Sequence, residues 1–345
     1  MKKIYLILSI FAIVFTACET DFDVNAESEE VTVVYGLLDA GDENNTQLIK
    51  INKAFLGEND ANEMAEDADN VNFNPTNLDV SIYRIKNGNI IDSVVVDTTI
   101  IIKDSLANDG EPGVFSINNN IIYTFENDGF LNSNSEYELL IKNNLTGNEV
   151  SSTTNIISGF DFDMGNGFPF GFIETWIAGN PSATKFSSTV VTWGQNYSDK
   201  GEQYQIDLIF NYQEGPKPFD LASAKDKSII YTTSVLEGTS QFEFEGEKFF
   251  NFLKNELDTD PSLVREFIRI DLVMTVGSED LKTYRIINEE ITGIVQERPQ
   301  FTNINNGIGL FSSRFTKTWI GEEVNIPDNT TYYLISIDGL DRNFQ

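Results

Sequence analysis

Residues 78–96 read LDVSIYRIKNGNIIDSVVV, and this stretch decides the fold that we predict for the first half of the chain. Apolar and more polar residues alternate from Leu78 to Tyr83, which is the period of a strand with one buried face. The Asn87-Gly88 pair follows, and both residues tolerate the positive φ angles of a type I′ turn. A second apolar run comes directly after the turn. The stretch therefore predicts a β-hairpin.

Similar short β-prone runs surround this hairpin, separated by turn residues. They cover residues 31–38, 47–55, 113–117, 121–126 and 136–143. Short strands at this spacing are typical of an immunoglobulin-like β-sandwich. We therefore predict such a sandwich over residues 31–157, without a helix.

An acidic segment, residues 58–70, interrupts the β pattern. Its acidic residues are Glu58, Asp60, Glu63, Glu66, Asp67 and Asp69, with no basic residue among them. The Gly and the closing Glu of an EF-hand are missing. We expect a solvated loop, with a calcium site as the alternative.

The rest of the chain, residues 158–345, predicts a second β-rich domain that carries two or three helices. Phe249, Phe250 and Leu253 fall on one face of a helix over residues 247–257. Asp260-Pro261 predicts the start of a short helix to residue 268, and Ser278 predicts the cap of another to about residue 291. Expected strands cover residues 189–193, 203–212, 228–234, 268–276, 308–315, 318–320 and 331–337.

Phenylalanine and glycine alternate in GFDFDMGNGFPFGF, residues 159–172. Its glycines and proline exclude a helix. The aromatic side chains either pack beneath the two domains or form a loop that contacts a partner, because aromatic residues are enriched at interface cores. The candidate partner- or ligand-binding residues are Phe160, Phe162, Phe168, Phe170, Phe172 and Trp176.

Composition excludes several classes of function for these 345 residues. With 23 Lys and Arg against 54 Asp and Glu, the formal net charge is -31, which opposes nucleic-acid binding. The chain has no histidine and a single cysteine, so histidine-dependent catalysis, an intramolecular disulfide and a cysteine metal cluster are excluded. We predict no metal and no cofactor. The remaining catalytic option is a carboxylate glycosidase, with Asp161, Asp163 and Glu174 as candidates.

The N-terminus has the pattern of a lipoprotein signal. Two lysines precede an apolar run over residues 4–15, which is too short to cross a bilayer. Phe15-Thr16-Ala17-Cys18 resembles a bacterial lipobox. Residues 1–17 therefore predict a signal peptide, with Cys18 as the lipidated residue that anchors the protein to a membrane. The acidic tether, residues 18–30, resembles the surface-export signal of Bacteroidota lipoproteins, with a generic spacer as the alternative.

A family resemblance comes from RPQFTNINNGIGLF, residues 298–311. This stretch resembles the C-terminal signature of Bacteroidota outer-membrane lipoproteins catalogued as domain of unknown function 4249. Residues 33–38 look like the opening strand of that family, with Tyr35 where an acidic residue is commoner. In physical terms, Asn306-Gly307 supplies a tight turn and Gly309 permits close backbone approach. Members of the family often accompany TonB-dependent receptors, and the resemblance implies no catalytic residues.

Together these features predict a non-enzymatic accessory subunit of an outer-membrane β-barrel machine, facing the cell exterior. The barrel is either a TonB-dependent transporter or the barrel-assembly complex, and other surface lipoproteins are further candidate partners. A freestanding glycan- or nutrient-binding lipoprotein is the alternative. In that case the aromatic segment and Trp176, Trp193 and Trp319 would supply the stacking surface.

Overall fold

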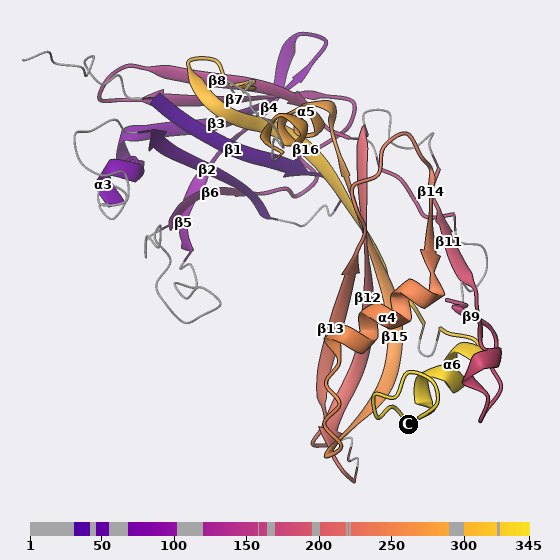
Figure 1. The fold of residues 1–345 in the computed structure, drawn as a ribbon. Coiled ribbons are helices and arrows are strands. Elements are labelled where there is room, and N and C mark those ends of the chain that lie inside the picture. The colour runs from indigo at the N-terminus through magenta and orange to yellow at the C-terminus, as the bar shows by residue number, and fades with distance from the viewer. Residues whose placement is uncertain are drawn as a thin grey trace, which may run out of the picture.

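The computed structural model describes residues 31–41, 46–54, 68–101, 120–157, 159–163, 170–194, 201–218, 220, 222–289, 300–322 and 325–345. The fold is mainly β, as predicted, and consists of a sandwich and a second β-rich module (Figure 1). The predicted signal, Cys18, the acidic tether, most of the acidic segment, the strand at 113–117 and Phe168 lie outside the described residues. No helix within those residues has the length and apolarity needed to cross a lipid bilayer.

The first half folds as the predicted immunoglobulin-like sandwich. One layer contains, in spatial order, β1 (Val31–Asp39), β2 (Thr46–Ala54), β6 (Asn120–Glu126) and β5 (Asp97–Ile101). The other layer contains, in spatial order, β4 (Asn89–Val95), β3 (Leu78–Lys86), β7 (Glu136–Asn143) and β8 (Glu149–Asn155). These orders correspond to strands ABED facing C′CFG of the immunoglobulin fold. A short 3₁₀ turn (Pro75–Asn77) precedes β3, and the four-residue helix α3 (Ala68–Val71) corrects the expectation of no helix.

A buried tyrosine at the start of β7 stabilises the sandwich through hydrogen bonds to the backbone. The Tyr137 hydroxyl donates to the Phe130 carbonyl oxygen at 2.8 Å and accepts from the Asn132 amide nitrogen at 2.6 Å. Its side chain is fully buried, and this burial raises the pKa of Tyr137. A buried tyrosine that bonds to the backbone a few residues upstream is the tyrosine corner of immunoglobulin-like domains.

The predicted hairpin is confirmed. Asn87 and Gly88 have φ angles of 51° and 74°, and they connect Lys86 of β3 to Asn89 of β4. Positive φ at both central residues is the requirement of a type I′ turn.

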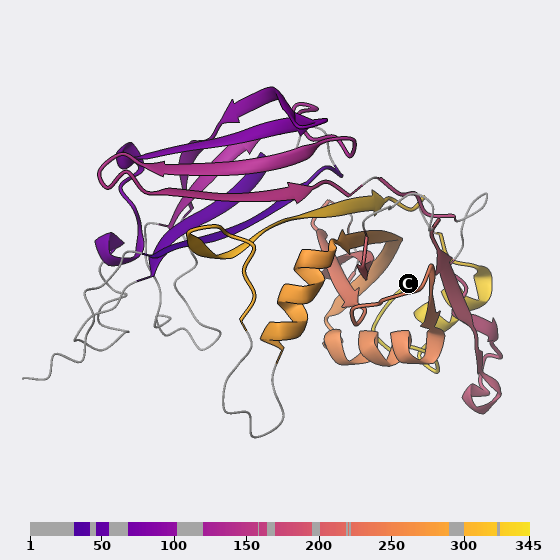
Figure 2. The same cartoon turned by 90° about the horizontal axis from the view of Figure 1, so that it is seen from above.

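A single long strand joins the two halves of the molecule. The sequence predicts two strands, 308–315 and 318–320, but the chain is continuous in β16 (Gly307–Trp319). Its first part pairs in parallel with β1, and its last part pairs antiparallel with β15 (Leu263–Gly277). With β12 (Gln203–Pro216) and β13 (Lys225–Thr232), the result is one eight-stranded sheet that extends through both halves (Figure 2).

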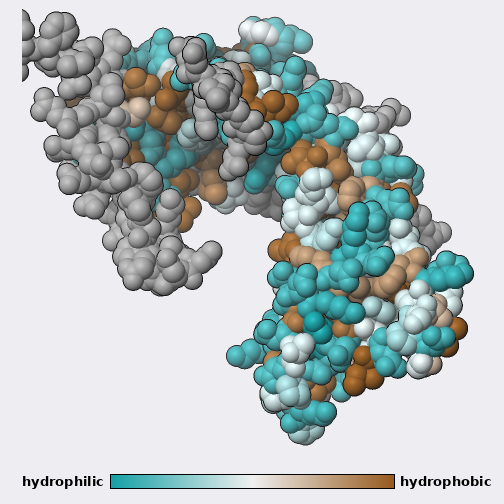
Figure 3. All heavy atoms as spheres, viewed as in Figure 1, coloured by the Kyte–Doolittle hydropathy of each residue, from teal (hydrophilic) through white to brown (hydrophobic). Residues whose placement is uncertain are grey.

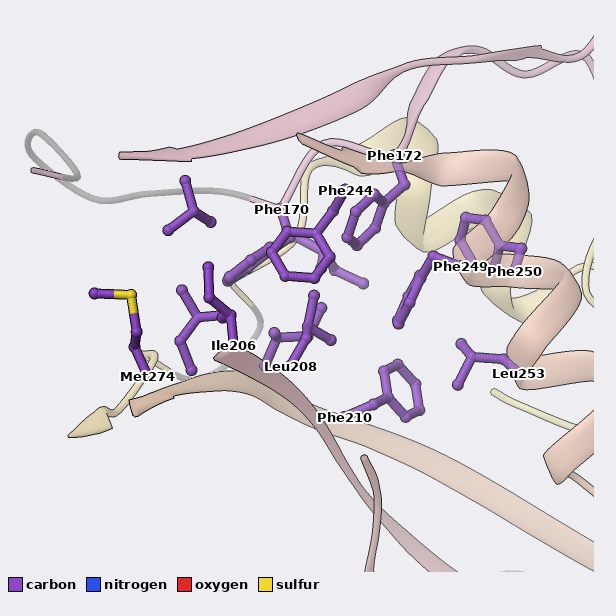
Figure 4. Close-up of a cluster of buried hydrophobic side chains, with 14 of the residues drawn as sticks. Phe170, Phe172, Ile206, Leu208, Phe210, Phe244, Phe249, Phe250, Leu253 and Met274 are labelled. Atoms are coloured by element: carbon purple, nitrogen blue, oxygen red, sulfur yellow. The ribbon is translucent and has the colours of Figure 1, made fainter. Parts of the chain in front are cut away.

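The second module has an aromatic core between its sheet and helix α4 (Gly246–Glu256). Phe249 and Leu253 of this helix point towards Phe210 of β12, and Phe250 packs against Phe172 (Figure 4). The helical period in the sequence thus identified the buried face. The core is closed by a ribbon of β11 (Ser188–Thr192) and β14 (Gln241–Glu245), a short pair of β9 (Ile173–Thr175) and β10 (Lys185–Phe186), a 3₁₀ turn (Pro181–Ala183) and helix α6 (Asp328–Ile335).

Helix α5 (Glu279–Asn288) begins where the sequence predicted. The Ser278 hydroxyl accepts from the Leu281 amide nitrogen at 3.5 Å, which is an N-cap.

Two predicted elements of the second module are wrong. Residues 261–268 do not form a helix, because the Asp260 carboxylate binds the Ser262 amide and hydroxyl and the chain then enters β15. Residues 331–337 have β-type composition, but most of them lie in α6. There Thr330, Tyr333 and Leu334 are buried at helical spacing. Tertiary packing overrides the local preference at this position.

The parallel β1–β16 pair depends on a glycine with a left-handed backbone. Gly309 has φ 116°, and a Cβ at this position would lie 2.0 Å from the Val34 carbonyl oxygen. The predicted close backbone approach is therefore confirmed.

We expect Gly309→Ala to lower the free energy of unfolding by about 3 kcal/mol, because strain and a backbone clash act together. Gly147→Ala is the matched control. Its φ is also positive, at 76°, but nothing lies within 4 Å of the added Cβ, so a loss of about 1 kcal/mol is expected. Urea unfolding of both variants measures the difference. Equal losses would show that the contact with Val34 is unimportant.

Candidate functional site

A cavity of about 430 Å³ lies where the sandwich meets the second module. We call it the junction cavity. It is formed on the outer face of β1, β2 and β16, beside helix α5, which lies in the angle between the two halves (Figure 2). Its lining is largely apolar, with a few convergent polar groups, as in many ligand sites. The lining includes Tyr35, Leu37, Leu48, Leu281, Tyr284 and Arg314.

A buried carboxylate fixes one end of this cavity. Asp39 is almost fully buried, and one of its oxygens accepts from the Gly41 and Thr316 amides at 2.9 and 3.1 Å. The other oxygen accepts from the Thr316 hydroxyl at 2.7 Å and from Arg314 Nε at 3.0 Å. These donors compensate the buried charge, which would otherwise be costly. The carboxylate thereby holds the Arg314 guanidinium in a fixed position at the cavity wall.

A pair of tyrosines marks the other end of the junction cavity. The rings of Tyr35 in β1 and Tyr284 in α5 meet edge to face, with centroids 6.0 Å apart. The Tyr284 hydroxyl donates to the Tyr35 hydroxyl oxygen at 3.3 Å. This hydrogen bond, aided by burial, raises the pKa of Tyr284 to about 12.

Hydrogen bonds hold α5 against β16, and they explain why a cavity forms beside the helix. The Ser278 and Ser312 hydroxyls lie 2.5 Å apart. Asn303 donates to the Asp280 carboxylate at 3.0 Å, and its amide also bonds both backbone groups of Phe311. The beginning of α5 is therefore fixed to the sheet on which the cavity lies.

Most of the sequence-predicted aromatic candidates lie in the core. Phe160, Phe170 and Phe172 are at most 4% exposed, and all three belong to the core of the second module. Figure 4 shows Phe170 and Phe172 within this core. Phe162 and Trp176 are partly buried against the same core. Phe160, Phe170 and Phe172 are thus packed as the first alternative describes, whereas Phe162 and Trp176 keep part of their surface exposed. Buried side chains present no surface to a partner in this fold.

The other sequence-predicted candidates are dispersed. Trp193 is buried and Trp319 is half-buried, each against the aromatic core. Asp161 forms a surface ion pair with Lys317 at 3.0 Å, and Glu174 is exposed on β9. Neither carboxylate lines the junction cavity. Within the described ranges, no group of three or more Asp, Glu, His or Cys residues is arranged to hold a metal ion.

A second notable surface is an apolar edge of the sandwich, which we call the β4–β5 flank. It consists of the exposed residues Ile90, Ile91, Val95, Ile100 and Ile101. Hydrophobic residues also appear on the sandwich surface in Figure 3. In the described part of the chain, β4 pairs only with β3 and β5 only with β6, so both are edge strands.

The composition of the β4–β5 flank differs from that of the opposite sheet edge. Strand β13, at the other end of the eight-stranded sheet, carries Lys225, Asp226 and Lys227. Charged edges of that kind discourage pairing with other chains. Beside β4, the outer face of the sandwich is hollowed by about 410 Å³, and Tyr83, Val95 and Leu140 line the hollow. Strands β4 and β5 carry one acidic residue each, Asp92 and Asp97, so they are less charged than β13.

Sequence reasoning did not identify either surface. The cavity residues Tyr35, Tyr284 and Arg314 are distant in the sequence, and only Tyr35 carried a signal, as an unusual residue in the opening strand. No protein-family model matches this chain, and no curated protein is significantly similar to it. The family resemblance of residues 298–311 therefore stays a prediction.

The tyrosine pair predicts a pH-dependent contribution to stability. Because its pKa is raised, protonated Tyr284 stabilises the fold below about pH 10, and this contribution is lost as the pH rises towards 12. Carbon-13 NMR of the tyrosine Cζ atoms, assigned with Tyr284→Phe, measures the titration. We expect Tyr35→Phe to lower the pKa of Tyr284. An unchanged titration in this variant would contradict the assigned cause.

Proposed function

We propose that this chain is a non-enzymatic accessory subunit of an outer-membrane β-barrel machine, anchored by a lipid on Cys18 and facing the cell exterior. The barrel is a TonB-dependent transporter or the barrel-assembly complex. The signal pattern, the acidic tether and the family resemblance support the location.

The observation that carries the docking part of the proposal is the β4–β5 flank. Exposed apolar residues on strands that are edge strands in the described part of the chain are suited to receiving an extended segment of a partner, since main-chain bonds give affinity and side-chain contacts give selectivity. Val95 is 79% exposed and adjoins the hollow on the outer face of the sandwich. A partner strand laid along β4 would cover both.

The anchor is tested by Cys18→Ser in the native cell. We expect this variant to lose metabolic labelling with an alkyne-tagged palmitate, because the thiol that accepts the lipid is gone. Membrane fractionation should show its release from the outer membrane. Labelling that persists in the variant would contradict the anchor, whatever the partner.

Docking is tested by purifying the tagged, lipidated protein from its outer membrane in mild detergent and identifying the chains that accompany it. We expect a stoichiometric β-barrel with the wild type and its loss with Ile90→Ser, Ile91→Ser and Val95→Ser combined. The matched control replaces three exposed apolar residues elsewhere, Leu145, Ile177 and Ile337, by Ser.

The control variant should retain the barrel. If the wild type is purified alone, the accessory function fails and the freestanding binding alternative gains support. If both triple variants retain the barrel, docking uses another surface.

A further inference from the structure

We propose that the junction cavity binds a small organic carboxylate with an apolar body. This inference does not rest on docking to a barrel, because the cavity and the β4–β5 flank are formed by different residues. It follows from the kind of polar group that the cavity presents, and from the distance between those groups.

Arg314 supplies the group that selects an acid. Its Nε is bound to Asp39, and its terminal amino groups have no acceptor among the described residues. The side chain is 47% exposed, so these groups are accessible from the cavity. A guanidinium held in position by one edge can bind a carboxylate with the other at little entropic cost.

The neighbouring carboxylate, Asp39, does not offer a ligand a second binding group. Asp39 is 8% exposed in its side chain, and donors from Gly41, Arg314 and Thr316 already occupy its oxygens. Gln47 is also committed, since its amide exchanges hydrogen bonds with the Asp39 backbone at 2.8 and 2.9 Å. Among the described residues that line this end, the charged group that stays accessible is therefore the guanidinium of Arg314.

The tyrosine end of the junction cavity also offers a donor. Because Tyr284 donates to Tyr35, the hydroxyl hydrogen of Tyr35 is left to bind an acceptor outside the pair. A ligand with acceptors fits these groups. Among the lining residues that the structure describes, the only carboxylate is that of Asp39, which is buried and already paired, so an ammonium group would find no accessible carboxylate among them.

The strand register sets the length of the apolar body. Tyr35 lies opposite Leu310, and Asp39 lies opposite Arg314, so the two polar ends are four residues apart along the sheet. That separation corresponds to about 13 Å. Leu37, Leu48 and Leu281 line the cavity as well and supply apolar contacts. A short aromatic or aliphatic chain that ends in a carboxylate matches this arrangement.

The test uses the lipidated full chain in lipid nanodiscs, with empty nanodiscs as the blank. The probes are 4-phenylbutanoate, 4-phenylbutan-1-ol and 4-phenylbutylamine, which share one body and differ in the head group. Their dissociation constants are measured by ligand-detected NMR. We expect the acid to bind most tightly and the amine most weakly. Equal binding of all three would show an unselective apolar hollow and overturn the proposal, as would no binding of the acid.

Two charge variants at one exposed position test recognition by charge without disturbing the fold. Leu48 is 49% exposed and lines the cavity, so neither Leu48→Glu nor Leu48→Lys removes core packing. We expect Leu48→Glu to weaken acid binding about tenfold and Leu48→Lys to preserve or strengthen it. Equal losses in both variants would contradict recognition by charge. These variants leave the flank intact, so co-purification of a barrel reports separately on the proposed function.

Discussion

The parallel pairing of β16 with β1 is the constraint on which the rest of the structure depends. It brings together strands from the two ends of the described chain, with Asp39 and Arg314 separated by 275 positions in sequence. Closing so long a loop costs conformational entropy, and the backbone pairing and the buried side chains of β16 offset it. Phe311 and Ile304 belong to the core of the sandwich, although they follow most of the second module in the sequence. The sandwich is therefore completed only after β15 of the second module has been synthesised.

The same pairing explains why a cavity lies at the junction. Because β16 continues from the sandwich into the second module, the two halves share a sheet and have a fixed relative position there. Helix α5, which follows β15, is bonded to β16 through Ser278 and Asn303 and is placed over the outer face of the sandwich. A group bound in the cavity contacts both halves at once. Its binding energy would thus stabilise the junction itself.

The sequence predicted those parts of the fold in which local pattern and tertiary packing agree. The 78–96 hairpin combines a strand period with a turn at the expected position, helix α4 follows a clear helical period, and helix α5 begins at its predicted cap, Ser278. Residues 331–337 show the opposite case, because aromatic and β-branched residues favour a strand while burial against the aromatic core selects a helix. The junction cavity could not be predicted. Its defining residues meet only through the β1–β16 register and the placement of α5.

The aromatic segment shows why composition alone does not locate a binding surface. Its phenylalanines suggested either a core or an interface, and Phe170 and Phe172 are both fully buried. The surfaces that remain accessible are instead lined by aliphatic residues and a few donors, on the sandwich and at the junction. Aromatic packing stabilises the second module, because Phe172 contacts both Phe249 and Phe250 of α4. The Thr330 hydroxyl also accepts from the Phe172 amide and so ties α6 to the same segment. This packing supports the side of the junction from which β15, β16 and α5 approach the sandwich.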